Sequence, residues 1–391
     1  MKLNNLSSQI HFCGKIIDAH AHIGKWQDGG NLRTFTIDQL DTFTKEPIKA
    51  SGGDVVDKML VSSLDCLSSA GQTDEYSANK KLIDSIKGRP QYAAIASCDP
   101  KGGSVENIKR LFDENPNSFL GLKFHPSGGG YFASDKALDP YLKFAQERKL
   151  PCLFHCEIPW KRVEAEKGIE KYVLENEPEK MPSSPQEIYK AAKKVPDTPV
   201  IMAHLGSGGR PAHEIAIKTL LDSIDKGEAL LYADISWVDC DKGLEHKPTI
   251  IDLIRKLKNH KKGDMTSRLL FGSDAPLGSF ASAQNGANVY GQSVADIKSA
   301  IKKNFEKDAD DLIDKIFYRN AHELFFKSQQ IQNQNGNSPI SQGAKSTAKK
   351  ISKTTLGLII GLGVAIIAGV AYLLHNKKSA QKISNKAQLV G

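Results

Sequence analysis

Short apolar runs recur along most of this 391-residue chain, and most of them are bounded by Gly, Pro or Asp. Their length and their content of β-branched and aromatic residues are typical of buried strands. The sequence therefore predicts eight strands, over residues 15–23, 57–65, 92–99, 119–126, 151–157, 199–206, 230–236 and 268–276.

The segments between these runs carry the apolar spacing of amphipathic helices. The pattern is found in residues 105–115, 138–148, 185–194, 212–226 and 250–259. Strands that alternate with helices indicate the α/β class, and eight such units in about 320 residues fit a (β/α)8 TIM barrel. In that fold the active site lies at the carboxyl ends of the strands, so polar residues at those ends are the candidates for chemistry.

The first apolar run ends in Asp18-Ala19-His20-Ala21-His22. Residues two apart on a strand point to the same face, so both imidazoles can reach one metal ion. Other polar residues stand at the ends of later runs, and a barrel would bring them to the same rim: Lys123, His125, His155, His204 and Asp274.

Several stretches, in this order, resemble the amidohydrolase superfamily, and within it the amidohydrolase-2 branch that includes aminocarboxymuconate-semialdehyde decarboxylase-like enzymes. They are IIDAHAHIG, GLKFHPSGG, LFHCE, AAKKVPDTPVIMAHLGSGG, LLFGSDAP and IFYRNAHELFF, and they span residues 15–326. The resemblance implies a catalytic divalent metal, with zinc favoured by imidazole and carboxylate ligands. Its ligands would be His20, His22, His155 and Asp274.

The resemblance also implies the catalytic roles. Asp274 would accept a proton from the metal-bound water, and His204 would polarise the substrate or protonate the leaving group. Lys123 has three interpretations: a carbamylated bridge between two metals, a contact for a substrate carboxylate beside one metal, or a lysine paired inside the barrel. We favour one metal ion, with two if Lys123 is carbamylated. His125 and Arg210 are candidate substrate contacts.

The expected activity is hydrolysis, in which metal-bound hydroxide attacks a carbonyl or ester-like carbon of a small molecule. The alternative is a metal-dependent, non-oxidative decarboxylase (a lyase) for a small unsaturated or aromatic acid, with Lys123 or Arg210 holding a carboxylate. A third hypothesis is a catalytically silent, membrane-tethered binding module.

The C-terminal part of the chain has a different composition. The barrel is expected over residues 1–326, a flexible polar linker over 327–355 and a basic tail over 375–391. Residues 356–374 contain no charge, and a helix of this length is about 28 Å long, which predicts a single transmembrane helix. Its small residues recur every four positions, a spacing that could pair two such helices in a homodimer: Gly357, Gly361, Ala365 and Gly369.

The net charge of +8 comes from the tail. Residues 327–391 hold nine lysines and no acidic residue, so residues 1–326 carry 44 basic and 45 acidic groups. A nearly neutral barrel argues against nucleic acid as a partner. The lysines on the two sides of residues 356–374 are equal in number and leave the orientation open. The six cysteines and an N-terminus without a signal-peptide pattern favour a barrel on the cytosolic side of the membrane.

Overall fold

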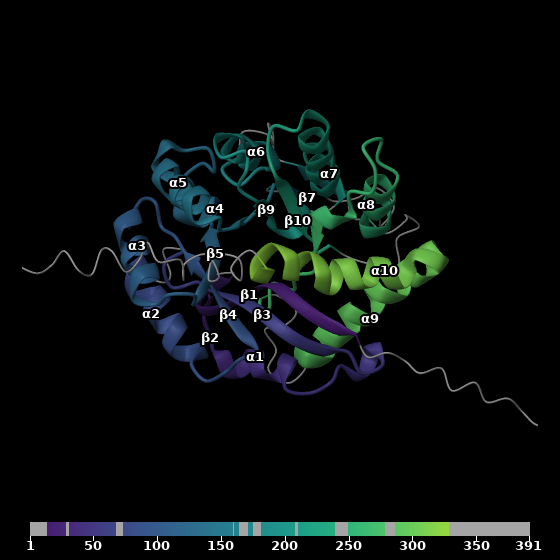
Figure 1. The fold of residues 1–391 in the computed structure, drawn as a ribbon, viewed down its shortest axis with the longest axis horizontal. Coiled ribbons are helices and arrows are strands. Elements are labelled where there is room, and N and C mark those ends of the chain that lie inside the picture. The colour runs from purple at the N-terminus through teal and green to yellow at the C-terminus, as the bar shows by residue number, and fades with distance from the viewer. Residues whose placement is uncertain are drawn as a thin grey trace, which may run out of the picture. The chain divides into compact units, whose positions relative to one another are not determined.

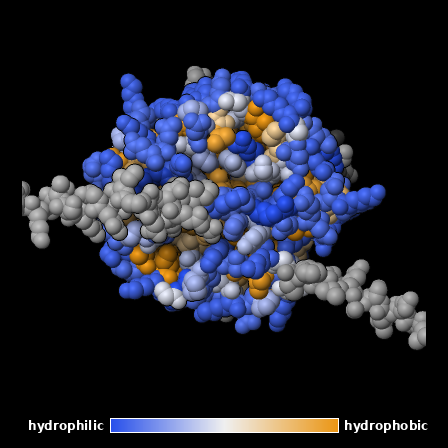
Figure 2. All heavy atoms as spheres, viewed as in Figure 1, coloured by the Kyte–Doolittle hydropathy of each residue, from blue (hydrophilic) through white to orange (hydrophobic). Residues whose placement is uncertain are grey.

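The structure is a computed structural model, and it describes residues 14–28, 31–67, 73–158, 160–163, 171–174, 181–207, 210–238, 249–277 and 286–327. These residues belong to a unit that extends from Met1 to Gln330. Figure 1 shows strands enclosed by helices, and Figure 2 shows a mostly hydrophilic outer face with scattered apolar positions.

Eight strands form one parallel sheet. Their order is β11 (Leu269–Leu270), β10 (Leu231–Asp234), β9 (Val200–Met202), β6 (Cys152–Phe154), β5 (Phe119–Phe124), β4 (Tyr92–Ser97), β3 (Val55–Ser63) and β1 (Lys15–Asp28). The residues after β11 then pair with β1, since Ala19 N donates to Phe271 O at 3.0 Å and His22 N donates to Ala275 O at 2.8 Å. The predicted α/β class is confirmed, and this closure is consistent with a TIM barrel.

Helices occupy the connections between the strands. The longer ones are α1 (Ile37–Thr44), α2 (Glu75–Ile86), α3 (Val105–Glu114), α5 (Asp139–Arg148), α6 (Pro185–Lys194), α7 (Arg210–Lys226), α8 (Thr249–Lys258) and α9 (Gly286–Phe305). The short helices α4 (Pro126–Gly129) and α10 (Ala309–Asp314) and the π-helical turns η9 (Lys315–Arg319) and η10 (His322–Lys327) complete the set. The five predicted helices correspond to α3, α5, α6, α7 and α8.

Short polar side chains fix where several helices begin. The side chains of Asp74, Ser104 and Ser184 accept hydrogen bonds from the backbone N–H groups three residues further on. Each therefore satisfies one N–H group that lacks a partner within its helix. Pro185 follows Ser184 at the first helical position of α6, where a missing N–H group costs nothing.

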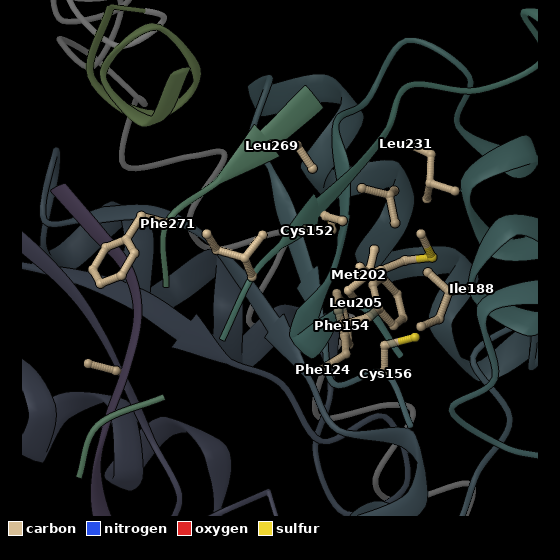
Figure 3. Close-up of a cluster of buried hydrophobic side chains, with 14 of the residues drawn as sticks. Phe124, Cys152, Phe154, Cys156, Ile188, Met202, Leu205, Leu231, Leu269 and Phe271 are labelled. Carbon is tan, nitrogen blue, oxygen red and sulfur yellow. The ribbon is translucent and has the colours of Figure 1, made fainter. Parts of the chain in front are cut away.

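The apolar residues form two main clusters that the sheet separates. The larger one packs between the strands and the surrounding helices, and Figure 3 shows Phe154 and Met202 from the strands gathered with Ile188 of α6. The smaller one includes Leu60, Ile95 and Leu153 on successive strands, together with Phe325. It fills the interior of the barrel at one end, which we call the lower end because the carboxyl ends of the strands lie at the other, upper end. In Figure 1 the yellow-green C-terminal turns that carry Phe325 cross the sheet.

The structure adds elements that the sequence pattern did not predict. Strand β1 extends beyond its predicted end at Ile23 and pairs antiparallel with β2 (Asn31–Phe35), while β7 (Trp160–Val163) pairs with β8 (Lys171–Leu174). Among the described helices, none is long and apolar enough to cross a membrane. The expected linker, transmembrane helix and basic tail lie outside the described residues, so these three assignments stay predictions.

Candidate metal centre

Three side chains converge at the upper end of the barrel. His20 and His22 project from β1, and Asp274 follows β11. The Nε2 atoms of His20 and His22 are 3.0 Å apart, and Asp274 Oδ1 lies 3.3 Å and 3.0 Å from them. All three residues are buried. The register of β1 against β3 shifts between Asp18 and Ala21, an irregularity of the kind that re-aims side chains beside active sites.

This group of atoms fits a divalent cation. His20 Nδ1 lies 3.0 Å from Asp234 Oδ2, and a carboxylate can only accept, so His20 Nδ1 carries the proton and its Nε2 presents a lone pair. Burial lowers the pKa of His22 to about 4, which keeps that ring neutral at pH 7. Ligand atoms bound to one metal at about 2.0–2.1 Å lie about 3.0–3.4 Å from one another, as these three do.

Lys123, from β5, is buried beside these atoms. Its Nζ lies 2.9 Å from His20 Nε2, and burial lowers its pKa to about 8. The ammonium group therefore balances one of the two carboxylates, Asp234 and Asp274, and the cluster keeps a net negative charge that a cation would neutralise. The register of β4 against β5 shifts just before Lys123, between Ala94 and Ala96.

The carboxyl end of β10 supports the site from outside. Asp234 accepts from His20 Nδ1 and, at 3.0 Å, from the backbone N–H of His204. Ser236 Oγ lies 2.8 Å from His204 Nδ1, and Trp237 Nε1 donates to Asp274 Oδ2 at 2.6 Å. His20, Asp234 and His204 form a second buried group whose atoms are close enough to hold a metal.

His155 lies on the other side of His204. Its Nδ1 is 3.2 Å from His204 Nε2, and its Nε2 is 3.3 Å from Glu157 Oε2. His155 belongs to neither compact donor group found among the described residues, so its role as a ligand stays a prediction. Burial lowers the pKa of His204 well below its usual range, which leaves this ring neutral at pH 7.

His125 stacks on His155, with ring centroids 3.9 Å apart, and Trp26 packs on its other side at 5.2 Å. His125 Nδ1 accepts a hydrogen bond from Gly128 N at 3.0 Å, so the ring caps α4 and its other nitrogen carries the proton. The second candidate substrate contact, Arg210, is the first residue of α7, and its side chain lies outside the described residues.

A pocket of about 240 Å³ opens onto the cluster. The lining includes both predicted polar groups and residues that the sequence analysis did not single out, among them Arg33 and Phe35 from β2. Arg33 is exposed and brings a guanidinium group to this pocket. The rest of the lining is His22, Trp26, Leu64, His125, His155, His204, Ser207, Trp237, Asp274 and Leu277.

The main residues that sequence reasoning missed are Asp234, Ser236 and Trp237. The signal was present, because the run LLYADIS ends in Asp and Ser as other strands end in His and Asp. Gly272 shows a tertiary requirement, since a Cβ there would lie 2.9 Å from His20 Cβ and 3.2 Å from Asp234 Cγ. His213, expected to be exposed in a loop, is buried in α7 with Nδ1 3.0 Å from Leu205 O.

A comparison with protein families places this site. The amidohydrolase model (Amidohydro_2) matches residues 17–327, which is more than half of the chain. The chain belongs to the amidohydrolase family. The predicted resemblance is therefore confirmed, and the His and Asp cluster lies within the matched residues. A search of curated proteins found no match.

Solved structures agree on the fold. An amidohydrolase from Burkholderia multivorans with bound zinc has a TM-score of 0.51 and 12% identity, over 80% of this chain and 99% of that chain. A probable 2-pyrone-4,6-dicarboxylic acid hydrolase from Acinetobacter baumannii scores 0.49 at 13% identity, over 79% and 98%. A 2,6-dihydroxybenzoate decarboxylase from Rhizobium scores 0.46 at 15%, over 80% and 98%.

Proposed function

We propose that this amidohydrolase-family chain is a metal-dependent hydrolase that acts on a carbonyl or ester-like carbon of a small molecule. The observation that carries the proposal is the buried donor group, in which two imidazole nitrogens and a carboxylate oxygen lie 3.0–3.3 Å apart at a pocket. His20, His22 and Asp274 would hold the metal, with His155 as the further ligand, and zinc suits this donor set.

A bound divalent cation would polarise the substrate oxygen and lower the pKa of water. The residues of the chain supply the rest. Asp274 is the carboxylate at the reacting centre and would accept the proton of the attacking water. His204 is neutral and lies in the pocket lining, where its Nε2 can orient the carbonyl oxygen or carry a proton to the leaving group. Asp234 and Ser236 hold the tautomers of His20 and His204.

Metal content tests the first step of this proposal. Elemental mass spectrometry on the full-length protein, purified without chelator, should find one equivalent of zinc. The matched variant is Lys123→Ala, which should leave that equivalent in place. Two equivalents that fall to one or none in Lys123→Ala would instead mean a carbamylated lysine between two metals. A wild-type protein that binds no divalent metal would refute the enzyme and favour the binding-module hypothesis.

A decarboxylase for a small unsaturated or aromatic acid is the second candidate. The observation in its favour is the pair of cationic groups at the site, Lys123 beside the donors and Arg33 in the pocket lining, either of which could hold a carboxylate. Arg210 remains a candidate for the same role. Carbon dioxide release without uptake of labelled oxygen from water would identify this reaction, whereas hydrolysis incorporates the label into the product.

We also propose that residues 356–374 anchor the chain in a membrane with the barrel on the cytosolic side. The support is their uncharged sequence, flanked by lysines. The test is flotation of the full-length protein with liposomes that contain anionic lipid. Val364→Lys with Ile367→Lys should abolish flotation, because each central lysine costs about 2.5–3.5 kcal/mol of insertion energy. Asn333→Lys with Asn335→Lys adds the same charge outside the segment and should float like wild type.

A further inference from the structure

One strand end, that of β10, contacts three of the groups that form the proposed centre. Within four residues, Asp234 accepts from His20, Ser236 meets His204, and Trp237 reaches Asp274. Two of these contacts hold histidine tautomers, as outer groups around metal sites commonly do. The third is different, because an indole N–H can only donate and here it binds the carboxylate itself.

The contact to Asp274 is specific in its geometry. Trp237 Nε1 donates to Oδ2 at 2.6 Å, whereas the oxygen that faces His20 Nε2 and His22 Nε2 is Oδ1. The two carboxylate oxygens thus have separate partners. Within the described part of the chain, Trp237 is the residue that donates a side-chain hydrogen bond to Asp274 from outside the histidine cluster.

The backbone at both ends of this contact is in the left-handed region. Trp237 has a φ of 57° and Asp274 a φ of 62°, and such values are uncommon for residues other than glycine. A bulky residue adopts this conformation only when its surroundings enforce it. Trp237 is also 44% exposed, so core burial alone does not explain why an indole is held here.

We propose that Trp237 is a positioning residue for the metal centre. Its indole N–H holds Oδ2 of Asp274 so that Oδ1 is the oxygen presented beside His20 and His22. This inference rests on the proposed metal-dependent function, and it assigns the pocket face of Trp237 a second task beside lining the pocket. If Trp237 only lined the pocket, loss of its N–H group would change substrate binding and leave the affinity for metal intact.

The test is the zinc affinity of Trp237→Phe, measured on the full-length protein by competition with a chromophoric chelator. Phenylalanine keeps an aromatic wall and removes the donor. We expect zinc to bind about 10- to 100-fold more weakly. The matched control is Trp26→Phe, the same change in the same pocket, at a tryptophan that packs on His125. Trp26→Phe should bind zinc like wild type.

Two further measurements separate positioning from other effects. The thermal midpoint of metal-free Trp237→Phe should match that of metal-free wild type, while the increase in midpoint at a fixed zinc concentration should be smaller in the variant. Once a substrate is found, the variant at saturating zinc should lose mainly kcat, since a misplaced carboxylate affects the transition state.

Zinc affinity equal to wild type in Trp237→Phe, or an effect confined to KM, would overturn the inference. A weakening of the same size in Trp26→Phe would also overturn it, because the effect would then belong to the pocket wall in general. Wild-type protein that binds no zinc would contradict the proposed function itself, and this result is read before either variant is compared.

Discussion

The two ends of the barrel interior are built from the same strands and have opposite chemistry. At the lower end, Ile17 of β1, Leu120 of β5 and Leu270 of β11 pack into one apolar cluster that Phe325 closes. A few residues further along, the same strands or the segments that follow them supply His20, Lys123 and Asp274. The comparison separates a region whose side chains stabilise the fold from one whose buried polar groups need a cation.

The largest effect should come from the upper end. Asp274→Asn removes the carboxylate that the proposed metal and the reaction both use, so turnover should fall by about 10³-fold or more and bound zinc should be lost. Zinc content and single-turnover kinetics measure this. Asp264→Asn, before β11 at the lower end, is the control and should retain zinc. Full activity in Asp274→Asn would contradict the assignment.

The lower end should respond in stability instead. Phe325 is 1% exposed, and Phe325→Ala should lower the free energy of unfolding by about 3–5 kcal/mol because it leaves a cavity. Its zinc affinity, measured well below the thermal midpoint, should not change. The neighbouring residue Phe326 is only partly buried, so Phe326→Ala should cost clearly less in the same urea titration. Equal losses would mean that the lower cluster does not depend on Phe325.

A smaller change should follow when the support of a ligand is altered and the ligand itself is kept. Asp234→Asn removes the negative charge that fixes His20 Nδ1–H, and we expect zinc to bind about 10- to 100-fold more weakly. Ser62 Oγ lies 2.8 Å from His22 Nδ1, so Ser62→Ala should act in the same direction and less strongly, since a neutral partner is lost. A titration with zinc and a competing chelator would rank the two, and the reverse order would argue that His20 depends little on Asp234.

The smallest expected effect concerns pH. Glu75, at the start of α2 on the upper side, accepts from the backbone N–H groups of Asp99 and Ser104, and burial raises its pKa to about 7. The folded state therefore keeps a proton that the unfolded chain releases near pH 4.5, so stability should fall by about 1–2 kcal/mol as the pH rises from 4.5 to 7.

Glu75→Gln should remove this decrease, because its side chain does not ionise, although the variant should be less stable at low pH since the amide has one acceptor oxygen in place of two. Urea unfolding of metal-free protein at pH 5.0 and 7.5 gives the comparison. Glu106→Gln, an exposed residue in the first turn of α3, is the control and should keep the pH dependence of wild type. An unchanged decrease in Glu75→Gln would assign the effect to other groups.

The sequence by itself determined the strands, the helices between them and the first half of the centre. Period and length alone locate a strand such as β5, and two histidines two residues apart on a strand face the same side wherever that strand lies. The order of the motifs predicted the family, which the comparison confirmed over residues 17–327.

Only the tertiary structure decided which distant groups meet. Asp234 reaches His20 across 214 positions of sequence, and Trp237 reaches Asp274 across 37, because closure of the sheet brings strand ends together in an order that no local pattern encodes. The shift of register in β1 is likewise set by pairing with β3. Local sequence fixes the direction of a side chain along its own strand, whereas packing between strands fixes its partner.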